Sequence, residues 1–510
     1  MKYVESDGIN THSVGYEYDT INNLTKLVET INGITHETSY TYDLDNRVTT
    51  VTTDGINKGY TYDAYGRVTT QTVGNESGTV LTETFGYNSG NQVTSLTIDT
   101  AGQDVAYTYT HDNNGNILSV SDGTNTTSYV YDSANQLLRE NNQAANKTWV
   151  WTYDNAGNIQ SKSEYAYTTG ELGEAVDMVS YGYDNDDWGG LLTSYDGVDI
   201  TYDEIGNPVD DGTWEYTWQH GRQLASMTDG ATTWSYEYNA DGLRTSRTNG
   251  TTTYNYVYNG GSLVQMTVGS NTLYFTSDTV TYNGVTYYYV KNLQGDVTAI
   301  VDGSGATVAT YVYDAWGNLI SDEPAANTIG HLNPIRYRGY VYDTESGFYY
   351  LQSRYYDPEL GRFLNADTYA STGQGILGNN MFAYCNNNVV NLADSGGTRS
   401  QVCVDDQFNA MRMPWQDGPT GGKSAYSLIV YPPNPNPWIT PVALINDAIA
   451  SKKIVSGAIN VFTGVAILLI PDPIPVADEV KAVAKVGKGL VQIISGLLKL
   501  VGVNTSLGGI

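Results

Sequence analysis

Tyr62-Asp63-Ala64-Tyr65-Gly66-Arg67-Val68 is one copy of a short sequence that recurs along most of this 510-residue chain. Close copies are Tyr-Asp-Asn-Ala-Gly-Asn-Ile at 153–159 and Tyr-Asp-Ala-Trp-Gly-Asn-Leu at 313–319. The Tyr-Asp pair stands at 18–19, 42–43, 62–63, 131–132, 153–154, 183–184, 202–203, 313–314, 342–343 and 356–357, with degenerate copies at 87–88, 111–112, 238–239 and 258–259. Many copies lie about 18 to 30 residues apart, a spacing typical of repeat arrays. The chain is therefore predicted to be an array of one small structural unit.

Each copy joins two segments that alternate like β-strands. Thr-Ser-Tyr-Thr-Tyr-Asp at 38–43 precedes one turn, and Arg-Val-Thr-Thr-Val-Thr-Thr at 47–53 follows it. Tyr, Val and Thr at alternate positions indicate strands, while Asp followed by Asn or Gly indicates a turn. One repeat is then a β-hairpin, which is marginally stable alone. Stacked hairpins bury one face, so we predict a mainly β fold in which antiparallel hairpins form a long sheet.

The composition changes near residue 397. Of the 44 Tyr residues, only Tyr426 and Tyr431 lie beyond it. The formal net charge of −30 is concentrated in the array, which carries about −32, while residues 398–510 carry about +2. Such an acidic surface repels phosphate, so no nucleic-acid partner is expected. A chain of this length is expected to need several domains or an extended array.

Two further features concern processing and redox chemistry. Residues 1–8, Met-Lys-Tyr-Val-Glu-Ser-Asp-Gly, lack the basic and apolar regions of a signal peptide. They begin within a repeat, so we expect a truncated chain or a gene fragment. Cys385 and Cys403 form neither a disulfide framework nor a metal-binding pattern. One disulfide between them and two free thiols both remain open.

A denser motif follows the array. Residues 337–367 read Tyr-Arg-Gly-Tyr-Val-Tyr-Asp-Thr-Glu-Ser-Gly-Phe-Tyr-Tyr-Leu-Gln-Ser-Arg-Tyr-Tyr-Asp-Pro-Glu-Leu-Gly-Arg-Phe-Leu-Asn-Ala-Asp. With residues 379–396, this region closely resembles the repeat-associated core of RHS/YD-repeat proteins, the bacterial relatives of teneurin shells, and it is most similar to their Gram-positive branch. The residues of the core motif are Tyr355, Tyr356, Asp357, Pro358, Gly361, Arg362, Phe363 and Asp367.

The resemblance implies a sheet that spirals into a hollow shell, with the core at the inner end of the spiral. It divides the chain into a repeat array at 1–310, a core at 311–397 and a variable region beyond. Composition divides that region into a Pro-rich linker at 398–440 and a helical segment at 441–510. In this family the segment after the core is often a toxin carried inside the shell. The chain's own C-terminal segment is thus the expected cargo, secretion or cell-surface display the expected location, and an immunity protein an implied partner.

Many members of this family release their cargo by self-cleavage with aspartates near the end of the core. Two neighbouring carboxylates do not both ionise readily, so one acts as acid and the other as base. Here the closing sequence is Asp394-Ser395-Gly396-Gly397, with Ser where the family has Pro, and Ile376-Leu377 replaces the Arg-Asp of cleaving members. Asp394, alone or with Asp367, is a weaker constellation. We expect no efficient self-cleavage, and turn-capping and ion-pairing roles for Asp357, Arg362, Asp367 and Asp394.

The tail changes from polar to apolar. Pro-Pro-Asn-Pro-Asn-Pro at 432–437 is typical of an extended linker. Residues 454–470 are a stretch of 17 residues without a charge, which is slightly short for a membrane span. Pro-Asp-Pro-Ile-Pro at 471–475 precedes a second apolar stretch at 489–503. Two apolar helices are expected, either contacting a membrane over 454–503 or forming a small bundle buried in the shell, and the buried form is favoured.

The tail lacks a recognisable catalytic set. All five His residues precede residue 398, so His-dependent nuclease and Cys-His hydrolase chemistry is not expected there. Residues 418–424 resemble a phosphate-binding loop, but Asp417 stands where the first Gly is required. Asp184-Asn185-Asp186-Asp187 lacks the spacing of a calcium loop. No cofactor and no metal are expected, and enzymatic activity is not the favoured interpretation.

Three functions remain open. The favoured one is a structural shell of the polymorphic-toxin type that presents a C-terminal segment, with membrane activity as one option. The second is a cell-surface protein that binds carbohydrate or partner proteins through Tyr and Trp, although sheet packing explains the same residues. The third, a self-cleaving aspartic protease, is the least favoured because Leu377 stands in place of a carboxylate.

Overall fold

The computed structural model describes residues 2–6, 11–102, 104–321, 323–369, 371 and 377–403, with side chains from residue 11 onward. The chain divides into two compact units, Met1–Thr420 and Gly421–Ile510. All described residues belong to the first unit. Residues 404–440 of the expected linker, the expected helical segment 441–510 and Ile376 therefore lie outside the described part of the chain.

The alternating runs form strands throughout. The first sheet contains β1 (Lys2–Ser6), β2 (Thr11–Tyr18), β3 (Leu24–Ile31), β4 (Ile34–Tyr42), β5 (Val48–Thr53), β6 (Ile56–Tyr62), β7 (Val68–Asn75), β8 (Gly78–Tyr87), β9 (Val93–Thr100), β10 (Asp104–His111), β11 (Ile117–Ser121), β12 (Thr126–Tyr131), β13 (Leu137–Asn142), β14 (Lys147–Tyr153), β15 (Ile159–Ala166), β16 (Asp177–Gly182), β17 (Ser194–Tyr195) and β18 (Val198–Asp199).

The second sheet contains β19 (Thr201–Tyr202), β20 (Pro208–Asp210), β21 (Glu215–Gln219), β22 (Gln223–Thr228), β23 (Thr233–Tyr238), β24 (Arg244–Thr248), β25 (Thr253–Asn259), β26 (Ser262–Val268), β27 (Asn271–Phe275), β28 (Thr279–Tyr282), β29 (Val285–Lys291), β30 (Val297–Val301) and β31 (Thr307–Thr310). The core follows, with α1 (Ile329–Leu332), β32 (Val341–Asp343), β33 (Phe348–Leu351), β34 (Arg354–Asp357), β35 (Arg362–Phe363), β36 (Leu392–Ala393) and β37 (Gln401–Val402). Short 3-10 helices span Tyr337–Gly339, Leu377–Asn379 and Cys385–Asn387.

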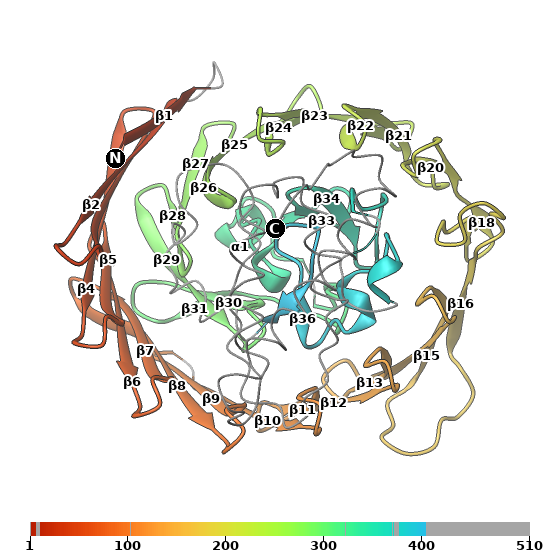
Figure 1. Ribbon diagram of the computed structural model, residues 1–510, viewed down its shortest axis with the longest axis horizontal. Coiled ribbons are helices and arrows are strands. Elements are labelled where there is room, and N and C mark those ends of the chain that lie inside the picture. The colour runs from red at the N-terminus through yellow and green to blue at the C-terminus, as the bar shows by residue number, and fades with distance from the viewer. Residues whose placement is uncertain are drawn as a thin grey trace, which may run out of the picture. The chain divides into compact units, whose positions relative to one another are not determined.

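Within each of these two sheets, each strand pairs antiparallel with the next strand in sequence, as in Tyr42 opposite Val48 and Tyr62 opposite Val68. Figure 1 shows the strands β1–β31 curling around α1 and β32–β36. In Figure 1, β28 and β29 lie inside the first strands of the wall. The two layers are in contact, because Lys58 Nζ lies 2.6 Å from Asp278 Oδ2 and Asn75 donates to the Tyr288 hydroxyl at 3.1 Å. The predicted mainly β fold and its spiralling hairpins are therefore confirmed. We call β1–β31 the wall.

The feature that recurs from repeat to repeat is a turn whose backbone is held by one side chain. Asp63 Oδ1 accepts the amide protons of Tyr65 at 2.9 Å and Arg67 at 3.0 Å, and Gly66 takes a φ of 82°. A carboxylate or amide oxygen that bonds its own downstream amides stabilises such a turn. The same two bonds recur at Asp19, Asp43, Asn88, Asp112, Asp132, Asp154, Asp203, Asn239, Asn292, Asp302 and Asp314.

Among the predicted copies in the wall, two differ from this turn. At Tyr183-Asp184 the Asp184 amide donates to Thr193 Oγ1 at 2.9 Å, while Asn185 Oδ1 accepts the amide protons of Asp187 and Trp188. At Tyr258-Asn259 the strands close tightly, since Asn259 pairs with Ser262.

The tyrosine of the motif links one repeat to the repeat before it. The Tyr62 hydroxyl donates to the carbonyl oxygen of Val48 at 2.6 Å, and the Tyr153 hydroxyl donates to that of Leu137 at 2.5 Å. Corresponding bonds are made by Tyr42, Tyr87, Tyr131, Tyr183 and Tyr313. The acceptor residue is the aliphatic residue that ends the preceding motif, so the hydroxyl fixes the offset between neighbouring hairpins.

Removal of one such hydroxyl tests this link. We expect Tyr153→Phe to lower the free energy of unfolding by about 1–2 kcal/mol, because the Leu137 carbonyl loses its donor. Tyr65→Phe is the matched control, since Tyr65 is 84% exposed, and it should change stability little. Urea denaturation of both variants measures the difference. Equal stability of the two variants would contradict the proposed link.

Candidate functional site

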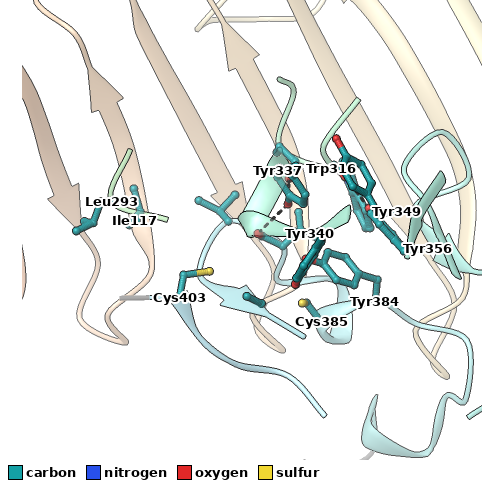
Figure 2. Packing of buried hydrophobic residues seen from close by; sticks show 14 of the residues in the cluster. Ile117, Leu293, Trp316, Tyr337, Tyr340, Tyr349, Tyr356, Tyr384, Cys385 and Cys403 are labelled. Atoms are coloured by element: carbon teal, nitrogen blue, oxygen red, sulfur yellow. Dashed lines mark hydrogen bonds between the residues drawn. The ribbon is translucent and has the colours of Figure 1, made fainter. Parts of the chain in front are cut away.

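Within the core, a hydrogen-bonded cluster of aromatic residues surrounds the turn at 313–319 (Figure 2). Three tyrosine hydroxyls donate to three successive carbonyl oxygens of this turn: Tyr337 to Ala315 at 2.8 Å, Tyr356 to Trp316 at 2.7 Å and Tyr349 to Gly317 at 2.9 Å. Tyr356 also stacks on Tyr384 with ring centroids 4.0 Å apart. Buried backbone carbonyls need such donors, so the tyrosines of the core hold this turn in place.

The tyrosines of the core motif serve this packing and one further contact. Tyr356 belongs to the cluster around Trp316, whereas the Tyr355 hydroxyl lies 3.1 Å from that of Tyr238 on the wall. Gly361 has a φ of 67°, and a Cβ atom there would lie 2.8 Å from the Trp316 ring. Glycine is therefore required at this position both for the backbone and for the close approach.

Arg362 joins the core to the wall. Its guanidinium donates to the Tyr183 hydroxyl at 2.5 Å and to the Gly190 carbonyl oxygen at 2.6 Å. Its side chain is buried, and both acceptors are wall residues far from it in sequence. The resemblance marked Arg362 as a motif residue, and the structure gives it an anchoring position.

Asp357 and Pro358 shape the turn between β34 and β35. Asp357 Oδ1 accepts the amide protons of Glu359 at 2.8 Å and Leu360 at 3.2 Å, and the Pro358 carbonyl accepts from Asn318 Nδ2 at 2.8 Å. Burial raises the pKa of Asp357 to about 7. Turn capping is what the sequence predicts for Asp357.

Asp367 and Asp394, the two candidate catalytic residues, converge on Arg354. Arg354 Nη2 lies 3.0 Å from Asp367 Oδ2 and 3.7 Å from Asp394 Oδ2, and all three side chains are buried. Asp394 Oδ1 also accepts the amide protons of Thr398 and Arg399. Burial raises the pKa of Asp394, although the Arg354 guanidinium acts in the opposite direction. A guanidinium between two carboxylates favours ion pairing over the sharing of one proton.

Phe363 packs on this group, whereas Leu377 contacts the wall. The Arg354 guanidinium lies 3.4 Å from the centroid of the Phe363 ring, a cation–π contact. Leu377 lies against the wall, because a Cβ atom built on Gly157 would come within 2.7 Å of its side chain. The Leu377 side chain is aliphatic and supplies no acid or base, as the sequence indicates.

Several buried charges of the core–wall contact were not singled out from the sequence. Arg244 on β24 makes a bidentate ion pair with Asp343 on β32, and Arg338 Nη1 lies 2.7 Å from Asp296 Oδ1. The partners in the first pair are 99 residues apart. Arg residues within otherwise Thr-rich strands indicate possible ion pairs, but the sequence does not identify their partners.

Glu140 is the clearest buried acid at this contact. Its Oε2 accepts the amide proton of Ala315 at 2.9 Å and its Oε1 accepts from Asn142 at 3.0 Å. Burial and the neighbouring Asp314 carboxylate raise the pKa of Glu140 to about 8. The wall therefore holds this turn through a buried carboxyl group whose pKa is raised.

One groove lies where the core meets the wall turns. It has a volume of about 360 Å³ and is lined mainly by Asn155, Asn158, Trp188, Asn379 and Asn380. Trp188 packs on Phe382 with ring centroids 5.7 Å apart. The combination of amides with an indole ring is suited to polar, ring-shaped ligands.

Among the described residues, no group of three or more His, Cys, Asp or Glu side chains is placed to hold a metal ion. Within those same ranges, no helix has the length and apolar character needed to cross a membrane.

The wall and the core match a known family. The sequence profile of the Teneurin YD-shell family matches residues 65–209 and 271–390. The tRNA nuclease WapA of Bacillus subtilis (strain 168) is 33% identical over 248 residues, which cover 43% of this chain and 10% of WapA. The uncharacterised protein YibJ of Escherichia coli (strain K12) is 42% identical over 111 residues, which cover 22% of this chain and 44% of YibJ.

Solved structures share the fold. The crystal structure of TcdB2-TccC3-Cdc42 has a TM-score of 0.60 and 18% identity, and covers 80% of this chain and 22% of that chain. The Tc holotoxin pore of Photorhabdus luminescens has a TM-score of 0.59 and 16% identity, and covers 77% of this chain and 22% of that chain. The chain thus spans about a tenth of WapA and about a fifth of these chains.

The buried Glu140 leads to a prediction about pH. Its folded pKa is raised, so the folded state keeps a proton that the unfolded state releases, and stability is lost as pH rises from about 4.5 towards 8. Glu140→Gln cannot ionise, and we expect its stability relative to the wild type to improve by on the order of 2 kcal/mol between pH 5 and pH 8.5.

Urea denaturation at both pH values measures this change. Glu164→Gln serves as the control, because Glu164 on β15 pairs with the partly exposed Lys147. The stability difference between Glu140→Gln and wild type should change with pH. The same difference at both pH values would contradict the raised pKa of Glu140.

Proposed function

The chain belongs to the Teneurin YD-shell family, and from this membership we propose that it is a shell segment of a polymorphic-toxin-type RHS protein that presents residues 398–510 as cargo. The observation that carries the proposal is the anchoring of the core by the wall, above all through Arg362 and through Arg244 with Asp343. A core fixed in this way gives the chain after residue 397 a rigid starting point. The likeness to WapA and the Tc toxin shells supports the same function.

We propose that Asp367 and Asp394 stabilise the core and do not cleave the chain. Arg354 forms ion pairs with both carboxylates, and Leu377 supplies no further carboxylate. The shell then presents its cargo while covalently attached. Delivery to another cell would require secretion or cell-surface display, and a toxic cargo would require an immunity protein in the producing cell.

A second candidate function is the binding of cell-surface glycans. The observation that favours it is the groove lined by Asn155, Trp188 and Asn379, whose amides and indole ring suit sugar hydroxyls and ring faces. The motif tyrosines that link neighbouring repeats do not add to this candidate, because their hydroxyls already donate to backbone carbonyl oxygens.

Titration of the full chain with neutral oligosaccharides tests the glycan candidate. We expect Asn379→Ala to weaken binding about tenfold, since one buried hydrogen bond to a ligand contributes on the order of 1 kcal/mol or more. Thr251→Ala, at an exposed turn of the wall, is the control. Binding that is equal in all three proteins would exclude the groove, and the absence of any binding would exclude the candidate.

Growth of bacteria that express residues 398–510, with and without an export signal, tests the cargo proposal. If the apolar stretch at 454–470 acts on membranes, the tail should arrest growth and lower the membrane potential. Val465→Asp combined with Leu468→Asp places charges in that stretch and should abolish the effect. The full chain should be tolerated and keep its mass of 55.6 kDa.

Each outcome of this experiment has a defined meaning. Normal growth with the tail in both compartments would overturn the membrane-active cargo. Two fragments that separate near residue 397 would overturn the structural role proposed for Asp367 and Asp394.

A further inference from the structure

The two layers of the wall meet through side chains. In the described part of the chain, β1–β18 and β19–β31 form separate sheets with no strand pairing between them, and Figure 1 shows β28 and β29 inside the first strands. The His36 ring on β4 lies 4.9 Å from the Tyr274 ring on β27, and Asn75 on β7 donates to the Tyr288 hydroxyl on β29 at 3.1 Å. We call this contact between β4–β8 and β27–β29 the seam.

A buried group of charges lies in the seam. Lys58 Nζ on β6 lies 2.6 Å from Asp278 Oδ2, and Lys291 Nζ on β29 lies 3.8 Å from Asp278 Oδ1. Lys291 also donates to the Ser277 carbonyl oxygen. Because charges removed from water are stable only when they are paired, this group ties the outer layer to the inner layer as long as its charges stay balanced.

Glu83 on β8 adds a second carboxyl group to the same place. Its side chain is buried, and the charges that act on it are those of Asp278, Lys58 and Lys291. Burial and the Asp278 carboxylate raise the pKa of Glu83 to about 7, although the two lysines act in the opposite direction. In an opened seam, water would solvate the carboxylate and its pKa would return towards 4.5. The closed seam therefore favours the protonated acid.

The other titratable groups around Glu83 do not weaken the seam as pH rises from 5 to 8.5. Despite burial, Lys58 and Lys291 lower the pKa of Asp278 to about 2, and Asp278 raises the pKa of Lys58. Burial raises the pKa of Tyr60, which also faces Glu83. Burial lowers the pKa of Lys291, a shift that favours the closed seam as pH rises. Glu83 is thus the group of this cluster whose ionisation favours opening.

We propose that the seam is a pH-sensitive latch, which is closed while Glu83 is protonated and opens when Glu83 ionises beside Asp278. The hairpins of β4–β8 would then separate from the inner layer. Later repeats stay attached to the core, because Asn391 donates to Asn116 and Asn387 donates to Gln136. The inference goes beyond the proposed function, because the latch acts whether or not residues 398–510 are a cargo.

The direction of the effect follows from linkage. The folded pKa of Glu83 is raised, so its contribution to closure is complete below about pH 4.5 and is lost as pH rises through 7. From pH 5 to pH 8.5 the ratio of closed to open seam should fall on the order of 100-fold.

The protection of a thiol placed in the seam tests the latch in the full chain. Val73 on β7 lies opposite Lys58 in the sheet and is 1% exposed. Val73→Cys therefore places a small thiol where a reagent reaches it only after local opening. Its rate of reaction with a dipyridyl disulfide is compared with that in the urea-unfolded chain at the same pH. We expect protection at position 73 to fall on the order of 100-fold from pH 5 to pH 8.5.

Matched variants assign the response to one side chain. Glu83→Gln should remove the pH dependence at position 73, which separates Glu83 from His36 in the same seam. Glu37→Gln should keep it, because Glu37 is 57% exposed and pairs with Lys26. The native thiols Cys385 and Cys403 are buried in the core and are followed in the same samples. They should react far more slowly than position 73 at pH 8.5.

Three results would overturn the latch. The first is equal protection of position 73 at both pH values. The second is an undiminished pH response in Glu83→Gln, which would assign the opening to another group. The third is reaction of the two core thiols at the same rate as position 73, because the whole shell would then open together.

Discussion

The hydrogen bond from the motif tyrosine to a carbonyl of the preceding repeat is the constraint on which the wall depends. A hairpin is marginally stable alone, and ladder bonds would tolerate a shift in register wherever both faces are polar. The Tyr62 hydroxyl, bound to the Val48 carbonyl, permits only one register between its own hairpin and the one before it. The Asp63 turn presents that tyrosine at a fixed place, because its carboxylate holds the backbone that follows. Together these two side chains make each repeat a template for the next.

The core uses the same hydrogen bond from a tyrosine hydroxyl to a backbone carbonyl oxygen, but concentrates several of these bonds on one turn. Tyr337, Tyr356 and Tyr349 bind three successive carbonyl oxygens of the turn at Ala315–Gly317, so several donors hold a single turn. Buried polar groups are costly unless they are paired, and this turn is satisfied only when the whole core has formed. The geometry explains why so many polar residues are tolerated in a densely aromatic interior.

Much of the wall was predictable from sequence because its interactions are local. Alternation and the Asp-to-Gly spacing predict strands and turns within a few residues of the actual ones, and the core motif follows from family resemblance. The Tyr-Asp pair does not mark the turns at Asn292 and Asp302, because Lys291 and Val301 precede the turn residue there. The pairing of Arg244 with Asp343 and the burial of Glu140 were not predictable, because both depend on how far the wall curves before it meets the core.

Sequential pairing of strands also bears on how the protein is made. Since each wall strand needs only the strand before it, hairpins can add one at a time as the chain leaves the ribosome, with short loops and little entropy lost at each step. The contacts between distant segments, such as Asn387 with Gln136, form last. Synthesis from the N-terminus therefore produces the core segment only after the wall strands that it contacts have been made. The core cannot pair with an incomplete wall.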